Sequence, residues 1–109
     1  MDVNKIVLID RLIDVLMDVR NIIQKTESNM VWSSYNSEDE LLRILDNHMV
    51  RLITVDFSKV DELVSLFLPT SDLQEISISS GWGDEYLILA DRFDKAIKDV
   101  IKGFNLNIR

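Results

Sequence analysis

The chain has 109 residues, with 19 acidic and 12 basic side chains and a formal net charge of −7. This length fits one domain with a single core, so we expect residues 1–109 to form one helical domain. A net charge of this sign repels phosphate backbones, which argues against nucleic acid as a partner. The absence of cysteine excludes disulfide scaffolds and thiolate metal sites and fits a reducing compartment, so we expect a cytoplasmic protein.

Glycine and proline content favours helices over strands. Three glycines and one proline are too few for the tight turns of an all-β fold of this length. The apolar stretch near the N-terminus is interrupted by Asp10, Arg11 and Asp14, so it resembles neither a signal peptide nor a membrane span. The spacing of apolar residues predicts an all-α, up-and-down bundle of four to five helices at about 3–27, 38–55, 58–68, 71–80 and 84–103.

Three of these predicted helices have clear apolar faces. In 84–103 and just after it, large or apolar residues recur every three or four positions, at Tyr86, Ala90, Phe93, Ile97, Val100 and Phe104. In 3–27 one broad apolar face consists of Leu8, Ile9, Leu12, Val15, Leu16, Val19, Ile22 and Ile23. In 38–55 the predicted inward face consists of Leu41, Leu42, Leu45, Met49, Leu52 and Ile53.

A second apolar strip lies beside the core face of helix 3–27. It consists of Ile6, Ile13 and Met17. In a monomer we expect it either to pack under a neighbouring helix or to face water, and otherwise to form a partner surface or the contact between two copies in a homodimer. A homodimeric structural or adaptor protein is therefore one of the functional alternatives.

Local signals set several helix boundaries. Ser37 and Glu40 have the spacing of a capping box, which predicts a helix start. Pro69 cannot donate an intrahelical hydrogen bond and predicts the end of helix 58–68. Residues 73–79 are ambiguous, because apolar and small polar residues alternate there as in a strand. We predict helix, since the chain has no second such run with which a strand could pair.

Side chains for catalysis or metal binding are few. The chain has one histidine and no cysteine, and we find no zinc, calcium or di-iron spacing and no glycine-rich phosphate loop. We therefore predict a protein that is not an enzyme and has no catalytic residues, cofactor or metal ion.

One pattern keeps an enzyme alternative open. Arg43 and His48 are separated by four residues, which resembles the Arg-x(4–6)-His motif of the HEPN superfamily of all-helical ribonucleases. The resemblance implies a helical ribonuclease in which Arg43 and His48 are catalytic. Residues five apart lie about 140° apart around a continuous helix, so a helix end or a second copy would be needed to bring them together. The simpler interpretation is a surface or half-buried histidine.

The negative charge is concentrated in the middle of the chain. Residues 27–85 contain twelve acidic and three basic side chains. Aromatic residues stand close to carboxylates at two places in this segment, which predicts one partner-binding face made of Trp32, Tyr35, Glu38, Asp39, Trp82, Asp84 and Glu85. Because Trp82 stands between two glycines, a plug over the core is the stronger interpretation of that residue.

Together these patterns predict a non-enzymatic protein-binding module with a basic protein as its partner. Antitoxins and toxin-immunity proteins are of this kind, since they present carboxylates where a cationic active site expects phosphate. No nucleic acid and no membrane are expected as partners.

Overall fold

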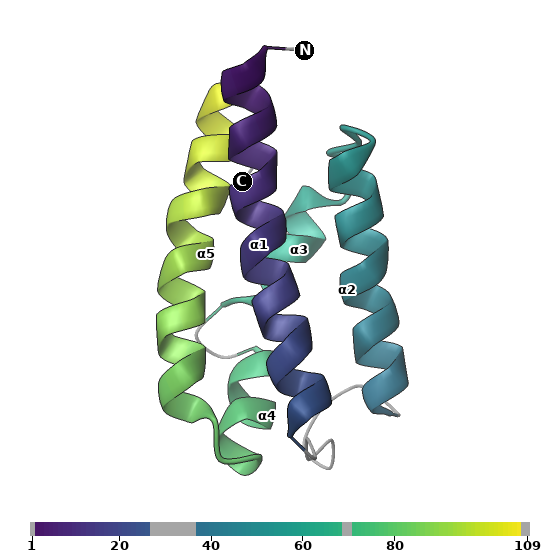
Figure 1. The fold of residues 1–109 in the computed structure, drawn as a ribbon, viewed down its shortest axis with the longest axis vertical. Helices are drawn as coiled ribbons and strands as arrows, with labels where there is room; N and C mark the ends of the chain where they lie inside the picture. The colour runs from purple at the N-terminus through teal and green to yellow at the C-terminus, as the bar shows by residue number, and fades with distance from the viewer. Residues whose placement is uncertain (1, 27–36, 69–70, 108–109) are drawn as a thin grey trace.

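The computed structural model describes residues 2–26, 37–68 and 71–107, and this part of the chain is built from helices without strands. In chain order the helices are α1 (Val3–Lys25), α2 (Glu38–Ile53), α3 (Val60–Leu66), α4 (Asp72–Ser79) and α5 (Gly83–Gly103). The long helix α1 packs against α5 on one side and α2 on the other, and runs antiparallel to both (Figure 1). The short helix α4 packs against α5. The predicted all-α bundle is therefore confirmed.

The predicted helix boundaries differ from the observed ones by no more than two residues at either end among the described residues. Helices α1 and α2 end earlier than predicted, at the C-cap residues Thr26 and Thr54. The hydroxyl of each threonine donates to the carbonyl one turn back and so satisfies a backbone group at the helix end. Helix α3 begins later than predicted. The amide of Ser58 donates to the carboxylate of Asp56 at 3.0 Å, so Ser58 belongs to a turn rather than to the helix.

Residues 73–79 are helical, which settles the ambiguity of their alternating pattern. Leu73 and Ile76, three residues apart, are both buried. The hydroxyl of Ser77, also buried, donates to the carbonyl of Gln74 at 2.7 Å. A small polar residue can therefore sit on the inner face of α4, because its hydroxyl is satisfied within the helix.

The core is one cluster of buried side chains to which all five helices contribute. The predicted face of α1 is confirmed, with Leu8 and Ile22 only partly buried. The predicted stripe of α5 is confirmed as well, with Ala90 and Phe104 partly buried at its margins. Ile53 is an exception: it was predicted to face inward, but it is 64% exposed at the last turn of α2.

Aromatic rings fill the centre of the bundle between α3 and α5. The rings of Phe67 and Phe93 stack with their centroids 3.9 Å apart. Tyr86 continues the stack on Phe67 at 6.4 Å, and Trp82 meets Tyr86 edge-on at 6.1 Å. These contacts join the start of α5 to the end of α3, because such ring pairs add to the stabilisation from buried area.

Two ion pairs join the long helices across the surface. Arg20 of α1 binds Asp46 of α2 at 2.7 Å, and Arg92 of α5 binds Asp18 of α1 at 2.8 Å. All four side chains are partly exposed, so each pair contributes little to stability.

Three helices end with a residue in the left-handed backbone region. At the ends of α2, α4 and α5 these residues are Val55, Gly81 and Asn105, with φ angles of 57°, 85° and 54°. In each case the next amide donates to the carbonyl five residues back. Glycine and asparagine suit this position, whereas a β-branched valine is strained there by roughly 1–2 kcal/mol.

We predict that Phe93→Ala lowers the free energy of unfolding by about 3–5 kcal/mol, because it removes a fully buried ring from the aromatic stack. Leu87→Ala, on the exposed face of the same helix, is the control and should change it by about 0.5 kcal/mol or less. Urea unfolding followed by circular dichroism measures both. An unchanged midpoint for Phe93→Ala would contradict the burial of this face of α5.

Candidate functional site

Two long helices begin at the same end of the bundle with carboxylates in their first turns. These are Glu38 and Asp39 of α2, and Asp84 and Glu85 of α5. Both starts lie at the lower end in Figure 1, where α1 ends between them. Helix N-termini carry a partial positive charge that stabilises negative side chains. The four predicted carboxylates therefore share one end of the molecule while standing on two separate helices.

Exposed aliphatic side chains accompany the carboxylates of α5. Ile78, Leu87 and Ile88 are each more than half exposed. Between α4 and α5 lies a cleft of about 180 Å³, lined by Gln74, Ser77, Ile78, Gly83, Asp84, Tyr86 and Leu87. A carboxylate beside aliphatic walls suits the stem and charged head of a lysine or arginine side chain.

Of the aromatic residues predicted for this surface, the structure describes Trp82, which is not brought to it. Trp82 is 2% exposed, and its ring packs against Tyr86 as a plug between α4 and α5. Its indole N–H is buried and finds no acceptor among the described residues. Trp32 and Tyr35 lie outside the described residues. Of the predicted face, the structure therefore places the carboxylates at the surface and Trp82 in the core.

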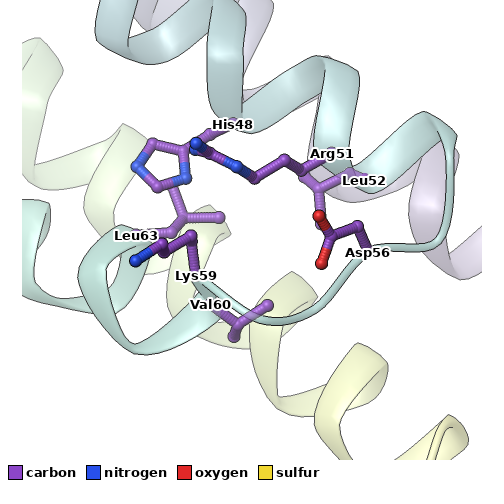
Figure 2. A pocket seen from close by; sticks show the side chains of 7 residues that line it. All are labelled: His48, Arg51, Leu52, Asp56, Lys59, Val60 and Leu63. Carbon is purple, nitrogen blue, oxygen red and sulfur yellow. The ribbon is translucent and has the colours of Figure 1, made fainter.

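The two residues of the ribonuclease alternative face different environments. Arg43 is exposed, whereas His48 is 5% exposed and faces α3. Figure 2 shows His48 in a pocket with Arg51, Lys59 and the apolar residues at the start of α3. This pocket leaves no room for a water molecule. Arg43 does not line it, so within one chain the structure does not bring Arg43 and His48 together.

The charge state of His48 follows from its surroundings. Burial lowers the pKa of His48, and the positive charge of Arg51 acts in the same direction, while Glu62 opposes them. Figure 2 shows the Arg51 side chain extending toward the imidazole ring. The imidazole is therefore neutral at pH 7 and acts as a polar side chain in the contact between α2 and α3.

The apolar strip of α1 borders a second surface feature. Ile6 and Met17 are exposed, while Ile13 is partly buried against the core. Between α1 and the end of α2 lies a groove of about 220 Å³, lined by Ile6, Ile9, Asp10, Ile13, Ile53 and Val55. We call this feature the α1/α2 groove. The end of α2 and the residues after it contribute two of the six lining residues, Ile53 and Val55, which the apolar periodicity had assigned to the core or left out.

A third cleft, of about 300 Å³, lies between α1 and α5 and has a mixed lining. The residues that line this cleft are Arg11, Asp14, Val15, Arg92, Lys95, Ala96 and Asp99. Arg92 is paired with Asp18 and Lys95 with Asp91, so these cations are already engaged. No group of side chains in the described part of the chain could hold a metal ion. Nor does any described helix have the length and apolar character needed to cross a membrane.

Comparison with protein-family models, curated proteins and solved structures finds no match to this chain. A function has to be inferred from the residues on its surface.

We predict that protonation of histidine destabilises the fold at mildly acidic pH. Since the pKa of His48 is lower in the folded protein than in the unfolded chain, the unfolded chain takes up the proton first as the pH falls. The free energy of unfolding should therefore decrease below about pH 6.5. His48→Gln should flatten this part of the profile, because His48 is the only histidine in the chain. Urea unfolding at about pH 7.5 and 5.5 measures the slope; an equal slope in both proteins would contradict the assignment.

Proposed function

We propose that this protein is a non-enzymatic protein-binding module that captures a basic protein, as antitoxins and toxin-immunity proteins do. The observation that supports it is the common location of Glu38, Asp39, Asp84 and Glu85 at one end of the bundle. We call these four carboxylates the acidic end. Their places at helix starts hold them in position before a partner arrives, which lowers the entropic cost of binding.

Charge and apolar contact have separate roles in this proposal. A net charge of −7 attracts a basic protein over a distance and raises its association rate. The exposed side chains of Ile78, Leu87 and Ile88 then supply apolar area that the partner covers. Removal of that area from water slows dissociation. In the cleft beside Asp84, a lysine or arginine of the partner would combine both effects.

The ribonuclease alternative has less support from the side chains. It requires Arg43 and His48 to act together, whereas Arg43 is exposed and His48 is buried against α3. A ribonuclease assay on the wild type and on His48→Ala separates the two proposals. Cleavage of RNA that depends on His48 would favour the enzyme. We place the binding activity in the cytoplasm, because the chain contains no cysteine.

We predict that Asp84→Asn combined with Glu85→Gln slows capture of the partner by about three- to tenfold at low salt and flattens the salt dependence. The partner is first isolated from extracts of the native cell on immobilised wild-type protein, and association is then measured by stopped-flow fluorescence. Asp94→Asn combined with Asp99→Asn is the matched control, since it removes two negative charges further along the same helix.

The control pair should change the association rate less than the pair at the acidic end. Adding Glu38→Gln and Asp39→Asn to the first pair should slow association further. Equal rates for the two double variants would show that only total charge matters, and the acidic end would then lose its assigned role.

A further inference from the structure

The α1/α2 groove is a continuous apolar surface left open by the fold. Ile6, Ile9 and Ile13 form one wall, and Ile53 and Val55 form the other. Beyond the groove, Met17 extends the apolar strip along α1, and Val50, one turn before Ile53, is also exposed on α2. Two antiparallel helices with an apolar furrow between them are the surface on which a third helix packs.

Val55 contributes to one wall of the groove although its backbone is strained. Val55 has a φ of 57°, at the helix-ending position where α4 has Gly81 and α5 has Asn105. Either of those residues would relieve the strain but would remove the apolar side chain from the groove. Strained backbone positions of this kind are concentrated at binding sites. A contact surface that needs the side chain of Val55 would explain why a valine stands at this strained position.

The charge around the groove is negative. Asp10 is the only charged residue among the described residues that line it. The nearby bases of α1 are used elsewhere: Lys5 lies over the ring of Phe104, Arg11 lines the cleft with α5, and Arg20 binds Asp46. The end of α2 carries the partial negative charge of a helix C-terminus, and the base in its last turn, Arg51, lines the pocket of His48 and not the groove. A basic occupant is therefore complementary to the groove.

A second copy of the chain fits this charge poorly. The apolar strip runs from Ile6 to Met17, so Asp10 lies close to its middle. A twofold axis through the strip would bring the two copies of Asp10 near each other, with no base among the described lining residues of either groove to separate them. Like charges in such a contact oppose association.

We propose that the α1/α2 groove binds an amphipathic helix of another protein, with an apolar ridge flanked by lysine or arginine. The strip from Ile6 to Met17 spans roughly 17 Å along α1, which corresponds to about three turns of the bound helix. Such a helix presents apolar side chains at positions i, i+3, i+4 and i+7. This inference rests on the proposed function in that the ligand is a basic protein, but it concerns a surface separate from the acidic end.

The probe for this proposal is a fluorescein-labelled synthetic helix with leucines at those positions and lysines on both flanks. Its twin has glutamate in place of each lysine. Fluorescence anisotropy with the full chain should show binding of the lysine peptide and none of the glutamate peptide. Asp10→Asn should weaken binding of the lysine peptide, because it removes the charge in the groove.

Ile53→Glu and Leu68→Glu are the matched variants, since these aliphatic residues are 64% and 48% exposed and both changes add one negative charge. Leu68 lines neither the groove nor the cleft beside Asp84. The added charge alone would attract the lysine peptide. Weaker binding to Ile53→Glu, by about tenfold or more, would therefore report loss of the apolar contact. Leu68→Glu should bind at least as tightly as the wild type. Val55→Gly should also weaken binding, and it provides a second test because glycine suits the backbone there.

Equal affinity of Ile53→Glu and Leu68→Glu for the lysine peptide would overturn the proposal. So would a wild-type dimer in sedimentation that Ile53→Glu converts to a monomer, because the occupant would then be a second copy.

The double variant Asp84→Asn and Glu85→Gln distinguishes the two surfaces. If the double variant slows capture of the native partner while Ile53→Glu leaves peptide binding unchanged, the acidic end stands and the groove fails. If the double variant leaves capture unchanged while Ile53→Glu weakens peptide binding, the groove stands and the acidic end loses its assigned role.

Discussion

Burial of one face of α1 between α5 and α2 is the constraint on which the rest of the structure depends. Leu12, Leu16, Val19 and Ile23 are completely buried, so α1 needs a helix on each side. Both neighbours run antiparallel to α1, which brings the starts of α2 and α5 to the same end of the bundle (Figure 1). Acidic side chains are favoured at helix starts. The acidic end is thus a consequence of the topology together with ordinary capping chemistry.

Much of the fold could be predicted from the sequence, because the signals involved are local. The apolar period of α1 and α5 identified their buried faces, and Ser37 caps α2 as its spacing indicated. The features that were missed depend on tertiary packing. Ile53 belongs to the inward period of α2 but is exposed, since α2 reaches its end beside the open groove. The left-handed backbone of Val55 contradicts the preference of valine and has no sequence signal.

The candidate site was predictable only in part, for the same reason. Carboxylates at helix starts can be recognised from the sequence, whereas the role of Trp82 depended on whether the core had room for its ring. The structure buries that ring against Tyr86. The second apolar strip of α1 is exposed at Ile6 and Met17 and partly buried at Ile13, and an occupant could not be inferred from α1 alone. The choice between a second copy and a basic helix rests on Asp10 and on where the bases of α1 are engaged.

Carbodiimide cross-linking in extracts of the native cell tests most directly whether this protein binds a basic partner through its carboxylates. The reagent joins a carboxylate to a lysine only where the two are in contact, and the pairs Lys95–Asp91 and Lys59–Glu62, at 3.0 and 3.5 Å, are internal positive controls. We expect mass spectrometry to find additional links from Asp84 and Glu85 to lysines of a single partner protein. Internal links alone, with none to another protein, would contradict the binding function.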